Sequence, residues 1–306
     1  MSYTLGIDIG GTKIASVIID RSYNIISRVE VESVNKDRES LFNQVIKAID
    51  LTIAKTSLTM TDLVGVGVGV PGKIDKKKGV AIYQNNIPWE NFPIVSRLQK
   101  EYSIKNVWLD NDVYLATLAE WKVSNISKNA TFVYLTVSTG ISCSIIHRGH
   151  FLRGDGFAGE IGLLPVETEV FKSKIDRLEQ VASGPAIEKA ARKLSFNKNI
   201  NAKEVFEEYY EDNKKANQII LSATKSIAHG VYSIICLLDP QQIVFGGGVI
   251  NNNPVMIELI KEQLTNFIVK EQKSSLDNVK LSHFTQNAGV IGAGIYAFKE
   301  GDIKKD

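Results

Sequence analysis

The sequence predicts an α/β protein with two domains. Apolar residues alternate with smaller or polar ones in short strands such as 5–9, whereas segments such as 41–53 have apolar residues at helical spacing. Strands and helices interleave along the whole chain, which is the pattern of an α/β fold. With 306 residues, of which 44% are hydrophobic and 23% charged, the chain has an ordinary globular composition and enough length for two domains.

The first strand continues into a predicted hairpin whose turn reads Gly10-Gly-Thr-Lys13. Glycines let an anion approach the backbone closely, and consecutive N–H groups can form a concave site for phosphate oxygens. Asp8, just before the turn, is positioned to hold the magnesium ion that accompanies a nucleotide. An ordinary hairpin turn with a solvated Lys13 is the alternative, because glycine-rich turns are common.

A similar unit begins near residue 131. Segment 132–137 predicts a strand, 138–142 a turn that contains Thr139 and Gly140, and 143–146 another strand. Two such units indicate a duplicated domain, with one phosphate-binding turn from each half facing across a cleft. We expect an N-terminal lobe at 1–122, onto which the C-terminal helix 288–306 packs back, and a larger, more helical lobe at 123–287.

Glycines also occur within and after predicted strands. Segment 64–70 alternates valine with glycine, and strand glycines often mark the close approach of another backbone or a ligand. Gly246, Gly247 and Gly248 follow a buried strand, where the base or ribose of a nucleotide could lie against bare backbone. A plain connection between strand and helix is the alternative at 246–248.

Three acidic residues are candidates for chemistry. Asp112 follows a predicted strand, where α/β sheets bind ligands, and its carboxylate could accept a proton from a hydroxyl during phosphoryl transfer. The alternative for Asp112 is a helix N-cap, a favoured role of aspartate. Glu160 and Glu179 lie in or near glycine-rich loops, and such carboxylates can orient a sugar by accepting its hydroxyl hydrogens. Solvated acids are the alternative for both glutamates.

Taken together, these motifs resemble the ROK family of bacterial sugar kinases, over nearly the whole chain and in family order. The motifs that carry the resemblance are Asp8-Ile-Gly-Gly-Thr-Lys13, Gly67-Val-Gly-Val-Pro-Gly72, Asn86-Ile-Pro-Trp89, Asn111-Asp112, Ser138-Thr-Gly140, Ala158-Gly-Glu-Ile-Gly162, Leu178-Glu179, Leu238-Asp-Pro240, Gly246-Gly-Gly248 and Ala288-Gly-Val-Ile-Gly-Ala293. The resemblance implies an actin-like, hexokinase-like ATPase fold (ribonuclease H-like) with two lobes around a cleft.

The resemblance also implies an ATP-dependent hexose kinase that uses Mg²⁺ and phosphorylates a hexose or N-acetylhexosamine, at the 6-OH of glucose or N-acetylmannosamine. Asp112 would be the catalytic base. The residues that would bind the sugar are Gly72, Asn86, Asn111, Glu160 and Glu179, and those that would bind ATP are Asp8, Gly10, Gly11, Thr12, Lys13, Thr139, Gly140, Gly246, Gly247 and Gly248. Asp8 would hold magnesium directly or through water. A β-glucoside kinase and a sugar-binding protein with little or no kinase activity remain alternatives.

Two departures from the family pattern bear on the site. Leu163 stands where the family has a histidine that contacts sugar and binds structural zinc, and the family's cysteine cluster is missing from 171–177. Because leucine, lysine and isoleucine cannot replace thiolate and imidazole ligands, we expect no structural zinc. The second turn also carries Ser138 and Ser142 where the family has glycines, which narrows the room for phosphate.

The net charge and the cysteine content indicate which partners and which compartment to expect. The formal net charge is only +2, and the run of lysines at 76–78 is expected to be a solvated loop face, so we expect no nucleic acid and no membrane. We see no long uncharged apolar stretch in the sequence that would indicate a membrane span. Two cysteines fit a reducing cytoplasm. The resemblance implies a homodimer, and the sugar-responsive repressors of the family are disfavoured because no basic recognition helix precedes Asp8.

Overall fold

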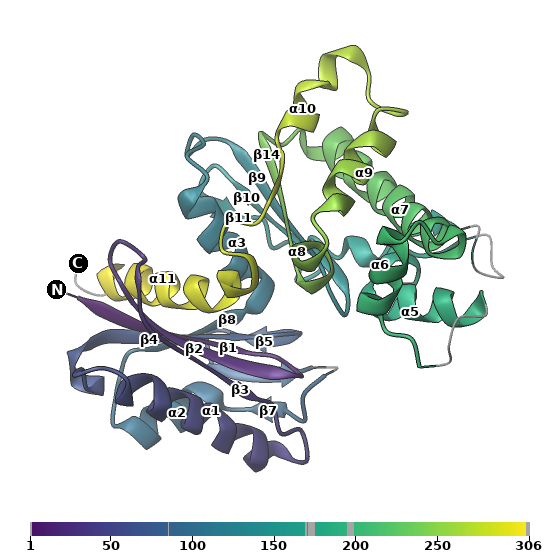
Figure 1. Cartoon of the computed structure of the whole chain (residues 1–306). Coiled ribbons are helices and arrows are strands. Elements are labelled where there is room, and N and C mark those ends of the chain that lie inside the picture. The colour runs from purple at the N-terminus through teal and green to yellow at the C-terminus, as the bar shows by residue number, and fades with distance from the viewer. Residues whose placement is uncertain (1, 85, 169, 171–174, 195–198, 304–306) are drawn as a thin grey trace. The chain divides into compact units, whose positions relative to one another are not determined.

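The computed structural model describes residues 2–84, 86–168, 170, 175–194 and 199–303, and it has an α/β fold with two compact units. Unit 1 contains Met1–Val123 and Asn287–Asp306, and unit 2 contains Ser124–Gln286. Each unit has its own five-stranded sheet and its own hydrophobic core (Figure 1). Because the C-terminal segment belongs to unit 1, that unit is assembled from two separate parts of the chain.

The sheet of unit 1 has the strand order β3-β2-β1-β4-β8. Its strands are β1 (Tyr3–Ile9), β2 (Lys13–Asp20), β3 (Ile25–Glu32), β4 (Leu63–Val70) and β8 (Val107–Asn111). β1, β2 and β3 are antiparallel neighbours, whereas β1, β4 and β8 run parallel. The three parallel strands therefore end at one edge of the sheet, where α/β sheets bind their ligands.

Helices cover both faces of this sheet (Figure 1). α1 (Arg38–Ala54) packs on β2 and β3, whereas α11 (Ala288–Ile303) packs on β1 and β4 and against α3 (Asp112–Val123). α2 (Ile94–Tyr102) contacts β8. A short 3₁₀ helix, Met60–Asp62, precedes β4.

Glycines in β1 and β4 allow α11 to lie directly on strand backbone. A Cβ at Gly6 would overlap the carbonyl oxygen of Val290, and a Cβ at Gly67 would overlap that of Ala293. The expectation that glycines in 64–70 mark the close approach of another backbone is confirmed at Gly67. Any larger residue at these two positions would push the helix away from the sheet.

A small antiparallel sheet, β5 (Lys73–Asp75), β6 (Val80–Tyr83) and β7 (Glu90–Phe92), follows β4. Just after β5, the ammonium of Lys76 lies 2.7 Å from Oδ2 of Asp110, whose side chain is 1% exposed, and 4.9 Å from the ring centroid of Tyr296. The three lysines at 76–78 are all exposed, as expected, but Lys76 also pairs with the buried carboxylate of Asp110, which requires a counter-charge. Lys76 thereby connects the small sheet, β8 and α11.

Unit 2 repeats the strand arrangement of unit 1, with the order β11-β10-β9-β14-β15. Its strands are β9 (Thr131–Val137), β10 (Ile141–His147), β11 (His150–Phe151), β14 (Gln242–Gly246) and β15 (Val279–Leu281), with a separate pair, β12 (Pro165–Glu167) and β13 (Ile175–Arg177). β9, β10 and β11 are antiparallel, whereas β9, β14 and β15 run parallel. The expected repeat of a strand-turn-strand unit is confirmed.

The helices of unit 2 pack around its longest helix. They are α4 (Leu178–Ala182), α5 (Gly184–Lys193), α6 (Ala202–Tyr210), α7 (Lys214–Leu238), α8 (Gly248–Asn252), α9 (Val255–Leu264) and α10 (Ser274–Asp277), with 3₁₀ turns at Ile161–Leu163, Lys270–Gln272 and Thr285–Asn287, the last of which leads into unit 1. By length and composition alone α7 could cross a membrane, but 61% of its most apolar stretch is buried inside the protein. Because α4, α5, α6 and α9 all contact α7, we interpret it as the core helix of unit 2.

The ion pair of Lys76 predicts a measurable loss of stability. Lys76→Met would leave the carboxylate of Asp110 buried without its lysine, and removing one partner of a buried pair costs roughly 3–5 kcal/mol. Because the side chain of Lys76 is 34% exposed, we expect a smaller decrease of about 2 kcal/mol in the free energy of unfolding by urea. Lys77→Met is the matched control, since Lys77 is exposed and should change stability by less than about 0.5 kcal/mol. Equal effects of both substitutions would contradict this role of Lys76.

Candidate functional site

In unit 1 the parallel strands bring acidic and amide side chains to one edge of the sheet. Asp8 on β1 is paired with Gly69 on β4, and the next pairs along β4 and β8 are Gly69 with Asp110 and Val70 with Asn111. Asp112 follows directly as the first residue of α3. We call Asp8, Asn111 and Asp112 the acidic edge.

Asp8 has a strongly perturbed acidity. Burial, followed by the negative charge of Asp112, raises the pKa of Asp8 from 3.8 to about 7, and the positive charge of Lys13 opposes this shift. The N-terminal end of α11 also lies against Asp8, because a Cβ at Gly289 would lie 2.5 Å from Oδ2 of Asp8. The carboxylates of Asp8 and Asp112 thus lie near enough to repel each other. A divalent cation is the kind of ligand that offsets such repulsion.

Asn111, rather than Asp112, caps α3. Its Oδ1 accepts hydrogen bonds from the backbone N–H groups of Val113 at 3.0 Å and Tyr114 at 3.4 Å, which is the geometry of an N-cap. Its Nδ2 donates to the carbonyl oxygen of Gly72 at 3.2 Å. The alternative that Asp112 is the helix cap is therefore wrong, although its Oδ1 does accept from the N–H of Val113 at 2.9 Å.

The turn Gly10-Gly-Thr-Lys13, which we call the first turn, lies next to Asn86. The N–H of Gly10 donates to the carbonyl oxygen of Lys13 at 3.0 Å and closes the hairpin. A Cβ at Gly11 would lie 2.8 Å from the carbonyl oxygen of Asn86, so only glycine fits here without displacing the neighbouring loop. Thr12 and Lys13 are exposed. A predicted ATP-binding turn and a predicted sugar-binding residue therefore lie in contact.

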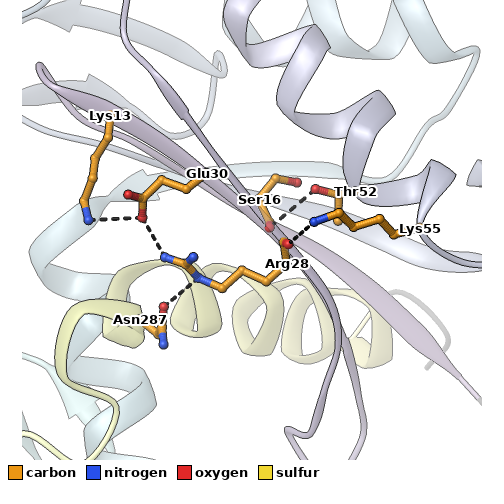
Figure 2. Close-up of polar contacts among 7 residues, drawn as sticks. All are labelled: Lys13, Ser16, Arg28, Glu30, Thr52, Lys55 and Asn287. Atoms are coloured by element: carbon orange, nitrogen blue, oxygen red, sulfur yellow. Dashed lines mark hydrogen bonds and ion pairs between the residues drawn. The ribbon is translucent and has the colours of Figure 1, made fainter.

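Figure 2 shows a chain of polar contacts that begins at the first turn. The ammonium of Lys13 lies 3.1 Å from Oε2 of Glu30, and the same oxygen lies 2.7 Å from Nη2 of Arg28. Nε of Arg28 in turn donates to Oδ1 of Asn287 at 2.8 Å. Because Asn287 immediately precedes α11, these contacts connect the first turn with the helix that covers Asp8.

In unit 2 the second turn, residues 138–142, is held by neighbouring elements. The N–H of Ser138 donates to the carbonyl oxygen of Gly140 at 2.9 Å, and the carbonyl oxygen of Ser138 accepts from the N–H of Gly184 at 2.9 Å. Oε2 of Glu179 accepts from the N–H of Ile141 at 3.0 Å, and a Cβ at Gly140 would lie 2.5 Å from that oxygen. Glu179 is therefore not a free solvated acid.

Glu160 lies in the same unit on a loop that folds onto β10. The carbonyl oxygen of Gly159 accepts from the N–H of Cys143 at 2.8 Å, and a Cβ at Gly159 would overlap the carbonyl oxygen of Cys143. Partial burial and then the negative charge of Glu179 raise the pKa of Glu160. The two glutamates, predicted from separate motifs, are thus near enough to interact, and burial followed by the charge of Glu160 raises the pKa of the Cys143 thiol to about 12.

The glycines at 246–248 lie beside the second turn. Gly246 pairs with Thr136, and β9 continues from there into the turn that carries the exposed Thr139. Gly247 has φ +87°, and a Cβ there would lie 2.6 Å from Oγ1 of Thr136. Apart from its chain neighbours and its own helix, no atom of the described residues lies within 4 Å of the position that a Cβ would take at Gly248, at the start of α8. The predicted nucleotide residues of unit 2 thus lie at the ends of two adjacent strands.

Metal ligands are sparse in the described part of the chain, where no three His, Cys, Asp or Glu side chains are grouped to hold a metal ion. Leu163 is exposed within the 3₁₀ turn after Glu160. Residues 171–174, where the family's cysteine cluster would fall, lie outside the described residues. The expected absence of zinc therefore stays a prediction from the residue types.

Within unit 1 the predicted residues meet in two contacts, Asn111 with Gly72 and Gly11 with Asn86, and in the repulsion between Asp8 and Asp112. Within unit 2 they meet around the second turn. The sequence did not single out the residues that support these groups. They are Arg28, Glu30, Ser33, Asn35, Lys76, Asp110 and Gly289. Of these, Gly289 lies inside a motif of the family, and Asp110 directly precedes the motif Asn111-Asp112.

Comparisons with known proteins identify the class. The model of the ROK family matches residues 4–300, so the chain belongs to the ROK family. It is 27% identical to a glucokinase of Halalkalibacterium halodurans over 311 residues, which cover 95% of this chain and 93% of that protein. It is 29% identical to an N-acetylmannosamine kinase of Haemophilus influenzae over 301 residues, which cover 95% and 94%.

Solved structures agree on the fold. A ROK hexokinase from Thermus thermophilus aligns with a TM-score of 0.80 and 27% identity, covering 99% of this chain and 100% of that one. A ROK glucokinase from Streptomyces griseus, in complex with glucose and AMPPNP, aligns with a TM-score of 0.81 and 22% identity, covering 97% and 100%. The predicted actin-like, hexokinase-like ATPase fold is confirmed by these alignments.

The raised pKa of Asp8 predicts a pH-dependent stability. Because Asp8 binds its proton more tightly in the folded protein than at its unfolded value of 3.8, the folded state loses stability as pH rises from about 4 to about 7. Asp8→Asn removes this titration. Without divalent cations, we expect the variant to match the wild-type protein near pH 4 and to exceed it by roughly 2–4 kcal/mol at pH 8 in urea unfolding. A constant difference across this range would contradict the assigned shift.

Because the sequence lacks the zinc-binding histidine and cysteines of the family, we predict that the protein contains no zinc. Protein purified without chelator should contain far less than one zinc ion per chain in elemental analysis, because a zinc site needs four ligands that this segment does not supply. A zinc-containing ROK protein prepared in parallel is the control. One zinc per chain would refute the prediction.

Proposed function

We propose that this protein is an ATP-dependent hexose kinase that transfers the γ-phosphoryl group of ATP to a sugar hydroxyl. The observation that carries the proposal is the acidic edge, in which Asp112 lies at the end of β8 beside the sugar-binding candidates Asn111 and Gly72. The glucokinase and the N-acetylmannosamine kinase among its relatives support this class of reaction. The acceptor would be the 6-OH of glucose or of N-acetylmannosamine.

Asp112 acts in this proposal as the general base. Its carboxylate accepts the proton of the sugar hydroxyl while the hydroxyl oxygen attacks the γ-phosphorus and ADP leaves. Because Asn111 caps α3 and donates to the carbonyl oxygen of Gly72, the cap does not depend on Asp112, whose carboxylate lies at the N-terminus of the helix. Asn111, Gly72 and Asn86 of unit 1 would orient the sugar, and Glu160 and Glu179 are the sugar-binding candidates of unit 2.

In unit 1 the first turn would bind phosphate groups at Gly10, Gly11, Thr12 and Lys13. The candidates for binding the nucleotide in unit 2 are Thr139, Gly140, Gly246, Gly247 and Gly248. Asp8 is the residue that fits magnesium, because its carboxylate is crowded by Asp112. Magnesium bound with ATP offsets the negative charge of the transferring group. The AMPPNP complex of the Streptomyces griseus glucokinase supports ATP as the phosphoryl donor.

The choice of sugar depends on Leu163. Where the family has a histidine that contacts sugar, Leu163 offers no hydrogen bond, and a site that lacks one polar partner discriminates less strongly between sugars. We therefore keep glucose, N-acetylmannosamine and β-glucosides as substrates to compare. Release of ADP with each sugar, measured with and without Mg²⁺, tests both the reaction and the acceptor.

A prediction for Asp112 tests the mechanism. Asp112→Asn keeps the size of the side chain but removes the proton acceptor, so kcat should fall by about 10²- to 10⁴-fold. The midpoint of thermal unfolding should change little, because Asn111 still caps α3. Asp212→Asn, at an exposed turn of unit 2, is the matched control and should keep full activity. Near-normal turnover of Asp112→Asn would assign Asp112 a structural role.

A sugar-binding protein without kinase activity is the second candidate. It is favoured by the second turn, where Ser138 and Ser142 replace glycines of the family pattern. Sugar binding without ADP release for any tested hexose would identify it. For either candidate we propose a cytoplasmic homodimer that binds neither nucleic acid nor membranes.

A further inference from the structure

Three successive carbonyl oxygens of the first turn are held by one segment of the chain, residues 33–35. The hydroxyl of Ser33 donates to the carbonyl oxygen of Gly10 at 2.7 Å. Nδ2 of Asn35 donates to the carbonyl oxygen of Gly11, and the backbone N–H of Ser33 donates to that of Thr12 at 2.9 Å. Segment 33–35 follows β3 and precedes α1, so it is anchored at both ends by regular structure.

These three contacts fix the direction of the turn's N–H groups. In a trans peptide the C=O and the following N–H point in opposite directions, and the described chain contains no cis peptide bond. With the carbonyls of Gly10, Gly11 and Thr12 turned toward segment 33–35, the N–H groups of Gly11, Thr12 and Lys13 point to the opposite side. Consecutive N–H groups that point to the same side can bind phosphate oxygens.

We propose that Ser33 and Asn35 are positioning residues for the phosphate groups of the nucleotide. They contact no phosphate themselves; they act by holding the carbonyls away from it. The proposal rests on the proposed nucleotide-binding function and adds two residues that lie outside the motif Asp8–Lys13. Without them the turn can rotate its peptide planes and present carbonyl oxygens, which repel phosphate, in place of N–H donors.

The chain offers a matched control for this role. Ser27 on β3 makes the same kind of contact, with its hydroxyl donating to the carbonyl oxygen of Thr52 at 2.8 Å, but Thr52 lies on α1 and not in the first turn. Ser27→Ala and Ser33→Ala therefore remove identical groups from the same region. Because Ser27 is buried, its loss should lower stability at least as much as the loss of Ser33.

The experiment compares ATP with adenosine. By titration calorimetry with Mg²⁺, we expect the affinity for ATP to fall about fivefold in Ser33→Ala and about tenfold or more in the double variant Ser33→Ala/Asn35→Ala. The affinity for adenosine should stay unchanged, because only the phosphate groups meet the first turn. In steady-state kinetics KM for ATP should rise while KM for the sugar stays constant. Ser27→Ala should keep wild-type affinity for both nucleotides.

Two results with the variants would overturn the proposal. One is a parallel loss of ATP and adenosine affinity in the double variant, and the other is a loss of ATP affinity in Ser27→Ala as large as that in Ser33→Ala. The outcome for the proposed function is separate. Wild-type protein that binds ATP but phosphorylates no sugar would refute the kinase reaction while the selective loss of ATP affinity would still support Ser33 and Asn35. Wild-type protein that binds no ATP would refute both.

Discussion

The close packing of α11 on the backbone of β1 and β4 is the constraint on which the acidic edge depends. It is possible because Gly6 and Gly67 have no side chains that would separate the helix from the strands. The same close packing places Gly289, near the N-terminal end of α11, against the carboxylate of Asp8 and excludes water from that carboxylate. Together with the charge of Asp112, this burial produces the raised pKa, so the chemistry of the edge is a consequence of backbone packing.

Each unit keeps two carboxylates near one another. Burial raises the pKa of Asp8 in unit 1 and of Glu160 in unit 2, and the negative charge of Asp112 or Glu179 raises it further. Such crowding costs stability in the free protein, and a cation or a hydroxyl-rich ligand that pairs with the carboxylates recovers it. Sites arranged for function are commonly less stable than they could be for this reason.

Local patterns were sufficient to predict the fold class, the hairpins and the long helix of unit 2, since strand and helix periodicity is a property of neighbouring residues. The position of Asp112 directly after a strand also followed from the chain order. What the sequence could not predict depends on partners far apart in the chain, such as Lys76 with Asp110. The sequence left a cap role open for Asp112, because Asn111 and Asp112 are both good cap residues and only the backbone shows where the helix begins.

The discontinuity of unit 1 has a consequence for the synthesis of the protein. Unit 2 is one uninterrupted stretch, Ser124–Gln286, so all its strands and helices are synthesised before α11. Until that last helix arrives, the face of β1 and β4 formed around Gly6 and Gly67 has no cover, and the emerging chain carries an incomplete domain. Nascent unit 1 therefore exposes apolar surface that is prone to aggregation until α11 packs on it.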